Sequence, residues 1–316
     1  MGSTVLVTGA TGKTGRRLVP LLLERGVTVR AASRHPEPAG VRFDWHEPDT
    51  YPAALRDVDA VYLVDTHLAD NEVVDPNAEV RAFLDSAADA GVRRVVLLSS
   101  FGVDHAPDTD PMRRTEILVE SAGIPSTVLR PAAFMQNFSE RHWSGMVTMI
   151  RERGEIAMPG GAGRVSYVST HDIAAVAAVA LTEDGHDGKG YTLTGPEPLT
   201  LAEVAEHLSA VAGHPVRYVE TGADAVRDGL LASGASAAFA GHVTAMYVGA
   251  VTTNVMAVVT DDIATVTGRP ATRFADFAAD AAEAWRLTPV LAARAGDGIG
   301  ADQRTQARAT PYQSGG

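Results

Sequence analysis

Cysteine is absent from the 316 residues of the chain. Its absence excludes disulfide bonds, a thiolate nucleophile and zinc bound by thiolates, and it leaves the cellular compartment open. The His-Glu-x-x-His pattern of zinc hydrolases is absent too, so we predict no metal site. Leu98 stands where the strand-to-helix turn of a serine hydrolase needs glycine, which excludes that nucleophile as well.

Lysine is rare, because Lys13 and Lys189 are the only two among 27 basic residues, and the acidic residues number 39. The resulting net charge of −12 repels a phosphate backbone, and no basic stripe offsets it. We therefore expect no nucleic-acid partner.

Charged side chains are missing between Gly229 and Thr260. A membrane span needs about 20 predominantly apolar residues, but this stretch carries His242, Asn254 and many small polar residues. We predict a pair of buried, Ala-rich helices and no membrane partner. The N-terminus lacks a basic segment followed by an apolar run, so we expect no signal peptide and a cytoplasmic location.

Short runs of β-branched residues alternate with amphipathic segments as far as residue 196. The predicted strands are residues 4–8, 27–33, 59–65, 93–100, 125–131, 164–169 and 190–196. Predicted helices between them include residues 16–26, 78–91 and 171–183, and Asp172 is expected to cap the last of these. This alternation is typical of βαβ units with right-handed crossovers, so the fold class is α/β with a doubly wound parallel sheet.

Helices dominate after Leu199, at residues 200–213 and 274–285, with one strand-like run at 215–220. We predict that this part forms a smaller, mostly helical C-terminal lobe. Beyond it the composition turns to Ala, Gly, Gln, Arg and Thr without periodicity, and we predict a disordered tail over residues 290–316.

The glycine-rich segment VTGATGKTGRRL, residues 7–18, lies between the first predicted strand and the first predicted helix. Its Gly12-Lys13-Thr14 resembles the end of a triphosphate P-loop. That loop needs a further glycine five residues before Gly12, where this chain has Val7, so a P-loop is excluded.

A dinucleotide-binding turn fits the same segment. Gly9 permits the tight turn after the strand, Gly12 lets the backbone approach a pyrophosphate, and Gly15 packs helix against strand. The N-terminus of the helix then offers N–H groups to the anion. The placement of these three glycines predicts a Rossmann dinucleotide site.

The end of the second predicted strand indicates which dinucleotide binds. An NAD site places a carboxylate there, about twenty residues after the glycines, but residues 30–36 contain none. Ser33 and Arg34 instead offer a hydroxyl and a guanidinium suited to a 2′-phosphate. We predict that NADP(H) is preferred over NAD(H).

With these residues in place, the chain resembles the NmrA-like atypical short-chain dehydrogenase/reductases. This family includes NADPH-dependent quinone and azo-dye reductases and redox-sensing regulators. The resemblance covers residues 4 to about 286 and includes blocks at 97–104, 123–138, 167–181, 188–209 and 266–285. It implies an NADP-binding Rossmann domain over residues 1–154 and 164–196, and a substrate-covering lobe over residues 155–163 and 197–289.

The resemblance also implies which residues meet the cofactor. The pyrophosphate would be held by Gly9, Thr11, Gly12, Lys13, Thr14 and Gly15, and the 2′-phosphate by Arg34. Along the rest of the cofactor would lie Asp65, Thr66 and His67, with Phe134, Met135, Gln136 and Asn137 near the nicotinamide. From its place after a strand, Ser99 is predicted to line the cofactor as well.

The uncharged stretch falls, by this resemblance, in the lobe that covers the substrate. We interpret it as the wall of a site for an apolar or aromatic small molecule, or as a surface buried against a second copy in a homodimer. The predicted substrate pocket comprises Phe101, Phe138, Trp143, Met246 and Tyr247.

The usual catalytic dyad of short-chain dehydrogenases, Tyr-x-x-x-Lys, is missing, because none of the seven tyrosines has a lysine four residues later. Related plant reductases use a lysine near the helix after the fifth strand, where this chain has Arg113 and Arg114. Arginine stays protonated, so a dedicated lysine or arginine acid is excluded by this count. His105 follows the fifth predicted strand and is either the proton donor or a solvated loop histidine.

Hydride transfer to an electron-poor acceptor needs positioning more than a protein acid. We therefore expect an NADPH-dependent reductase of a small apolar or aromatic, quinone-like or enone-like compound. The alternatives are a non-enzymatic NADP-binding redox sensor that acts through a protein partner, and a non-redox enzyme on the same fold.

Overall fold

The computed structural model of the protein describes residues 2–286 except 39, 66–67, 70–71 and 74. Met1–Arg286 forms one compact unit, and the division into two lobes remains a prediction about its organisation. The predictions for Thr66, His67 and the tail at 290–316 lie outside the described residues.

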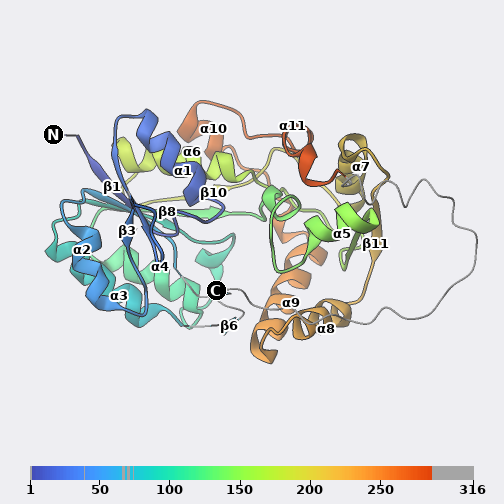
Figure 1. The fold of residues 1–316 in the computed structure, drawn as a ribbon, viewed down its shortest axis with the longest axis horizontal. Coiled ribbons are helices and arrows are strands. Elements are labelled where there is room, and N and C mark those ends of the chain that lie inside the picture. The colour runs from blue at the N-terminus through green and yellow to red at the C-terminus, as the bar shows by residue number, and fades with distance from the viewer. Residues whose placement is uncertain (1, 39, 66–67, 70–71, 74, 287–316) are drawn as a thin grey trace, which may run out of the picture. The chain divides into compact units, whose positions relative to one another are not determined.

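A seven-stranded sheet forms the first half of this unit (Figure 1). Its strand order is β10-β8-β7-β4-β1-β2-β3, and every neighbouring pair is parallel. The strands are β1 (Thr4–Val7), β2 (Thr28–Ser33), β3 (Val41–Arg42), β4 (Ala60–Leu63), β7 (Arg94–Leu98), β8 (Ser126–Pro131) and β10 (Lys189–Leu193). The order reverses between β1 and β4, which confirms the predicted Rossmann class.

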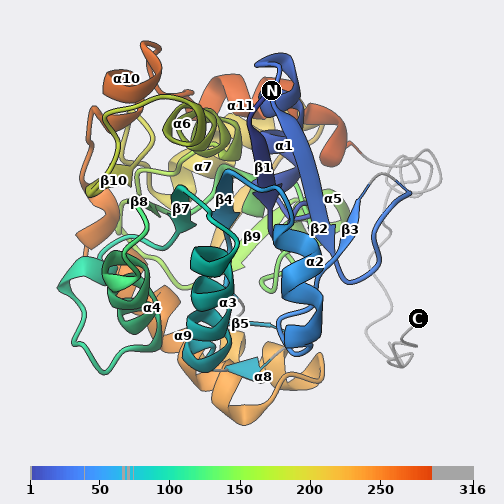
Figure 2. The ribbon, with the colours of Figure 1, turned by 90° about the vertical axis from the view of Figure 1, so that its left-hand side faces the viewer.

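Helices cover both faces of the sheet. Successive side chains of a strand point to opposite faces, so each face presents apolar side chains to the helices that cover it. Val5 and Val7 of β1 pack in the same core cluster as Leu18 and Leu22, whereas Leu6 packs in the cluster that contains Phe83. Figure 2 shows α1 (Gly15–Glu24) and α6 (Thr170–Thr182) on one side of the sheet. On the other side are α2 (Tyr51–Leu55), α3 (Asn77–Asp89) and α4 (Pro111–Ser121).

The second half of the unit is mostly helical and has its own core (Figure 1). Two parallel strands, β9 (Glu155–Met158) and β11 (Arg217–Glu220), pair with each other. Around them lie α5 (Met146–Arg153), α7 (Leu201–Ala212), α8 (Ala223–Ala232), α9 (Ala237–Thr252) and α11 (Phe274–Asp280). Between α9 and α11 the chain returns to the sheet, where α10 (Asp262–Thr267) packs on α6. A short antiparallel pair, β5 (Leu68–Ala69) and β6 (Glu72–Val73), follows β4.

Two sequence-based predictions about this fold are wrong. Residues 164–169 form no strand, because Val165 bridges Leu199 and Val168 bridges Phe134, so no partner continues along the segment. The helix that follows is capped by Ser169, whose hydroxyl accepts from the His171 N–H at 3.2 Å. Asp172, expected as the cap, accepts hydrogen bonds from Thr272 instead.

The uncharged stretch, residues 229–260, includes the end of α8 and all of α9. These helices were predicted to be buried, but each has an exposed side. The buried residues of α9 are Phe239, Ala240, Val243, Thr244 and Val251, whereas Met246 is 45% exposed. The helix is thus buried on one side and exposes mainly small and apolar residues on the other. It has 16 residues, and within the described part of the chain no helix is both long and apolar enough to cross a membrane.

Candidate active site and cofactor site

The glycine loop after β1 has the geometry of an anion cradle. Gly9 has a φ of +62°, and the Gly12 N–H donates to the Gly9 carbonyl at 2.9 Å, which closes the turn. A Cβ on Gly15 would lie 2.3 Å from the same carbonyl, so only glycine fits there. The Thr14 side chain does not cap α1. In the first turn of this helix, the Arg16 N–H donates to the Gly12 carbonyl at 3.1 Å and the Arg17 N–H to the Thr14 carbonyl at 3.0 Å.

The loop is fixed to the sheet at the point where the strand order reverses. The Thr8 hydroxyl donates to the Tyr62 carbonyl at 3.0 Å and accepts from the Val64 N–H at 2.8 Å. The Tyr62 hydroxyl in turn donates to the Thr14 hydroxyl at 3.1 Å. Thr14 is buried, and this contact engages its hydroxyl. Thr11, in contrast, is exposed.

The segment after β2 lies at the same edge of the sheet. Ser33 is the last residue of β2, and its hydroxyl accepts from the His35 N–H at 3.1 Å. Arg34 follows and is exposed. Asp65, which follows β4, is half-buried.

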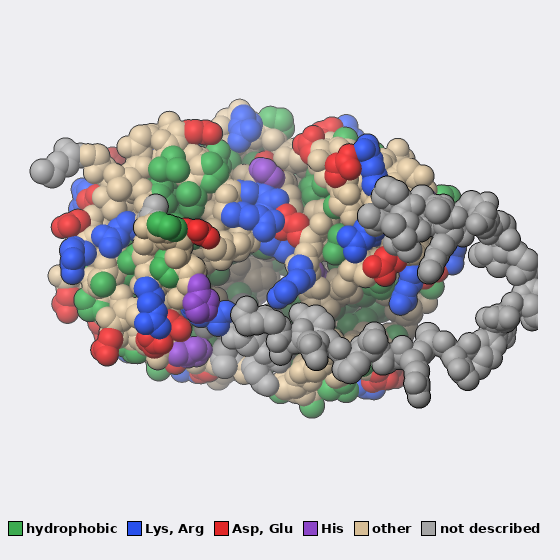
Figure 3. Space-filling view, viewed as in Figure 1, with side chains coloured by type: hydrophobic (Ala, Val, Ile, Leu, Met, Phe, Trp, Pro, Cys, Tyr) green, Lys and Arg blue, Asp and Glu red, His purple; other side chains and the backbone are tan. Residues whose placement is uncertain are grey.

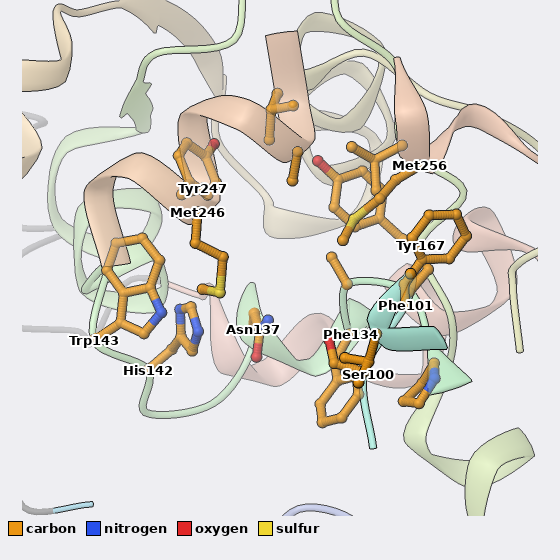
Figure 4. Close-up of a pocket in the computed structure, with 18 of the residues that line it drawn as sticks. Ser100, Phe101, Phe134, Asn137, His142, Trp143, Tyr167, Met246, Tyr247 and Met256 are labelled. Carbon is orange, nitrogen blue, oxygen red and sulfur yellow. The ribbon is translucent and has the colours of Figure 1, made fainter. Parts of the chain in front are cut away.

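A cavity of about 570 Å³ extends from the glycine loop into the helical half. Its wall includes the aromatic side chains of Phe101, Phe134, Phe138, Trp143, Tyr167 and Tyr247, together with Met112, Met246 and Met256. Figure 4 shows Asn137 between two groups, with Trp143, Met246 and Tyr247 on one side and Phe101 and Phe134 on the other. Trp143 and Tyr247 meet edge to face, with ring centroids 5.7 Å apart.

Nine of the predicted site residues converge on this cavity. Those that line it are Lys13, Ser99, Phe101, Phe134, Asn137, Phe138, Trp143, Met246 and Tyr247. Met135 and Gln136 are buried and do not line it. The Gln136 Oε1 accepts a hydrogen bond from the Thr170 N–H at 2.8 Å. His105 is exposed at the end of a short turn and does not line the cavity.

Polar residues that line the cavity outside the predicted site include Ser100, Asp110, Arg141, His142 and His242. Arg141 and His142 lie in the loop that follows Phe138, and no periodicity or motif distinguishes them. Figure 3 shows Lys and Arg side chains gathered beside a hollow in the middle of one face of the protein. Arg16 and Arg17 both form ion pairs with Glu140 near this loop.

Lys13 is the main electrostatic feature of the cavity. Its Nζ donates a hydrogen bond to the Asn137 Oδ1 at 2.6 Å, which links the glycine loop to the segment after β8. Burial lowers the pKa of Lys13 to about 8, although Glu140 acts in the opposite direction. Burial and the charge of Lys13 lower the pKa of His142 to about 3, so this histidine is neutral.

A buried ionic cluster lies beneath Ser99. The Glu116 carboxylate is fully buried and receives two hydrogen bonds from Arg130, each 2.8 Å long. Arg113 donates to the same carboxylate at 2.7 Å and the Ser99 hydroxyl donates at 2.6 Å. The cluster therefore fixes Ser99 at the edge of the cavity.

The parallel sheet, the glycine cradle and the adjoining cavity define a dinucleotide-binding protein with a separate site for a small molecule. Residues 9–184 match a family described as NAD(P)H-binding. The chain therefore belongs to the NAD(P)H-binding family of oxidoreductases, and the predicted NmrA-like resemblance is confirmed.

Relatives of known function support this assignment. The chain is 38% identical to an NAD(P)H azoreductase of Xenophilus azovorans, over 87% of this chain and 96% of the relative. It is 36% identical to a (4-alkanoyl-5-oxo-2,5-dihydrofuran-3-yl)methyl phosphate reductase of Streptomyces griseus, over 89% and 99% respectively. A triphenylmethane reductase of Citrobacter sp., solved with NADP(H), has a TM-score of 0.73 and 24% identity, over 89% of this chain and 99% of that one. The similarity to the triphenylmethane reductase shows a shared fold.

Proposed function

We propose that the protein is an NADPH-dependent reductase that transfers hydride to a small aromatic, quinone-like or enone-like acceptor. The observation that carries this proposal is a cavity of about 570 Å³ with aromatic walls that is continuous with the glycine cradle through Lys13 and Asn137. Such a cavity suits a flat conjugated molecule beside a nicotinamide. The reductases named above act on compounds that fit this description.

The residues of the site fit the cofactor. The glycine loop leaves no room for a Cβ at Gly15, and this loop and the positive end of the α1 dipole would hold the pyrophosphate. When bound, the cofactor supplies the hydride. The chain orients the acceptor by packing it between aromatic walls, and the same walls exclude water. The buried Tyr247 hydroxyl has no hydrogen-bond partner in the described part of the chain, which leaves it for a polar atom of the ligand.

Replacing Arg34 by alanine should remove the preference for NADPH. If its guanidinium binds the 2′-phosphate, its loss should weaken NADPH binding by about 10- to 100-fold, since charge-assisted hydrogen bonds contribute about 1.5–3 kcal/mol. NADH binding should change little. Calorimetric titration of both reduced cofactors and both oxidised ones measures the effect, with Arg56→Ala as a control at a surface arginine. Reduced forms that fail to bind while oxidised forms bind would contradict a reductase.

Replacing Tyr247 by aspartate should raise the KM for an aromatic acceptor at least about tenfold, because an unpaired carboxylate in an apolar wall is costly to desolvate. Leu231→Asp is the matched control, since Leu231 is 42% exposed on α8 and does not line the cavity. Sedimentation of both variants separates this effect from a change in oligomeric state. An unchanged KM and an unchanged oligomeric state would show that α9 is neither a substrate wall nor a subunit interface.

A further inference from the structure

Lysine was excluded as an acid because neither lysine occupies the position that related reductases use. The fold changes this conclusion, because the glycine loop carries Lys13 into the wall of the cavity. Its side chain passes the turn and reaches the Asn137 amide. A residue in the phosphate-binding loop is thus also a residue of the acceptor site.

We propose that Lys13 is the proton donor of the reductase, acting on the oxygen of a neutral conjugated carbonyl acceptor, with Asn137 as its positioning residue. The inference rests on the proposed function. It names a catalytic group and restricts the acceptor to molecules that become anionic when they receive a hydride. Such molecules need a proton, and Lys13 offers one from within the cavity.

The other titratable groups around the cavity are less suited to this role. His242 lines the cavity from α9 but is exposed. His142 lines it, but burial beside Lys13 keeps its imidazole neutral. Burial raises the pKa of Tyr167 and of Tyr247 well above the ordinary value of a tyrosine. Arg141 stays protonated, as every arginine does near neutral pH. Asp110 is the carboxylate in the wall, and it caps α4 by accepting from the Met112 and Arg113 N–H groups.

The environment of Lys13 is suited to proton transfer. Burial and the neighbouring charges of Arg16 and Arg17 favour the neutral amine, whereas Glu140 favours the ammonium. These opposing influences bring the pKa of Lys13 to about 8, close to a physiological pH. A general acid works best when its pKa lies near the working pH.

The chemical step balances as follows for an enone. The hydride forms a C–H bond at the β-carbon, and the electrons of the conjugated double bonds shift until the carbonyl π pair rests on oxygen. The Nζ–H bond of Lys13 then breaks, and its proton forms an O–H bond with that oxygen. The acceptor is reduced to an enol, the reduced nicotinamide is the species oxidised, and neutral Lys13 regains a proton from water. A quinone gives a hydroquinone by the same count.

Two kinds of acceptor separate proton donation from every other role of Lys13. A neutral quinone needs both a hydride and a proton. A triarylmethane dye cation needs only the hydride, because the product is neutral.

The variants separate the charge of Lys13 from its proton. Lys13→Arg keeps a positive charge for the phosphates but cannot give up a proton, and Lys13→Met removes both the charge and the proton. Lys189→Arg is the matched control, because Lys189 is the other lysine of the chain and is exposed at the start of β10.

With the quinone, we expect Lys13→Arg to lower kcat by at least about 100-fold, the lower end of general acid catalysis. With the dye cation, the fall in kcat should be much smaller, because a change in cofactor binding affects both acceptors alike and only the quinone needs the proton. Calorimetry of NADPH binding measures the shared effect. An equal loss with both acceptors, or no loss with either, overturns the assignment, as does wild-type turnover of the dye alone. Wild-type protein that turns over neither acceptor overturns the proposed function itself.

A second readout does not depend on turnover. In Lys189→Arg protein with labelled lysine side chains, the one remaining NMR signal reports Lys13. The pKa of Lys13 should be about 8, and Asn137→Asp should raise it by placing a carboxylate 2.6 Å from Nζ. The alkaline fall in kcat/KM for the quinone should move upward in the same variant. A signal or a pH profile that Asn137→Asp leaves in place overturns the proposed pairing.

Discussion

Replacing Glu116 by alanine should lower the free energy of unfolding by about 3–5 kcal/mol, the usual cost of leaving a buried charge without its partner. The carboxylate is fully buried, and it is the centre of hydrogen bonds from Arg130, Arg113 and Ser99. Without it, the guanidinium of Arg130, whose side chain is only 10% exposed, would retain acidic neighbours no closer than 3.7 Å. Urea denaturation of wild type and variant measures the difference.

Glu120 provides the control for this prediction. It lies one turn further along α4 and contacts Arg113 at 3.3 Å, but its side chain is 42% exposed. Glu120→Ala should cost less than about 1 kcal/mol, because solvent screens an exposed ion pair. Equal losses in the two variants would mean that burial does not determine the contribution of this cluster. Ser99 loses its hydrogen-bond acceptor in Glu116→Ala, so turnover of the substrate should fall in that variant as well.

Replacing Gly15 by alanine should weaken NADPH binding at least about 100-fold, the effect of displacing a positioned group by about 1 Å. The new Cβ would lie 2.3 Å from the Gly9 carbonyl oxygen and 2.8 Å from the Ala10 Cα. Both are backbone atoms of the turn, so no flexible side chain can yield, and the anion cradle must open. Calorimetry gives the change in Kd for NADPH, and thermal denaturation reports whether the variant stays folded.

Gly229→Ala is the matched control for Gly15→Ala. Gly229 lies in α8, and a Cβ there would meet nothing within 4 Å. Alanine in an open helical position should stabilise the protein by about 0.5–1 kcal/mol. Unchanged NADPH affinity in Gly15→Ala would contradict the assignment of this loop to the pyrophosphate.

The sheet could be predicted from the sequence with little error. The predicted strands 4–8 and 59–65 became Thr4–Val7 and Ala60–Leu63, because strands buried on both faces have nearly continuous apolar runs. The two-residue β3 and the four-residue β9 leave no comparable pattern. Residues 164–169 have the composition of a strand but lack a partner along their length, and composition alone cannot show this.

The site was predictable where a motif fixes the backbone and less so where loops meet in space. Gly9, Gly12 and Gly15 were identified by their spacing, and the aromatic wall by its resemblance to a family. Arg141 and His142 reach the cavity through a loop with no motif. Lys13 was predicted to contact a phosphate, but its link to Asn137 joins residues 124 positions apart, which only the fold reveals.

The two lysines of this protein lie at opposite ends of the parallel strands, which bears on how the protein can be attached to a solid support. Lys189 is exposed at the first residue of β10, on the edge where the parallel strands begin. Lys13 follows β1 on the opposite edge, within the wall of the cavity. An amine-reactive support that couples through Lys189 would therefore hold the enzyme by the end of the sheet that lies away from its binding site. Molecules attached through Lys189 would present the cavity to the solution.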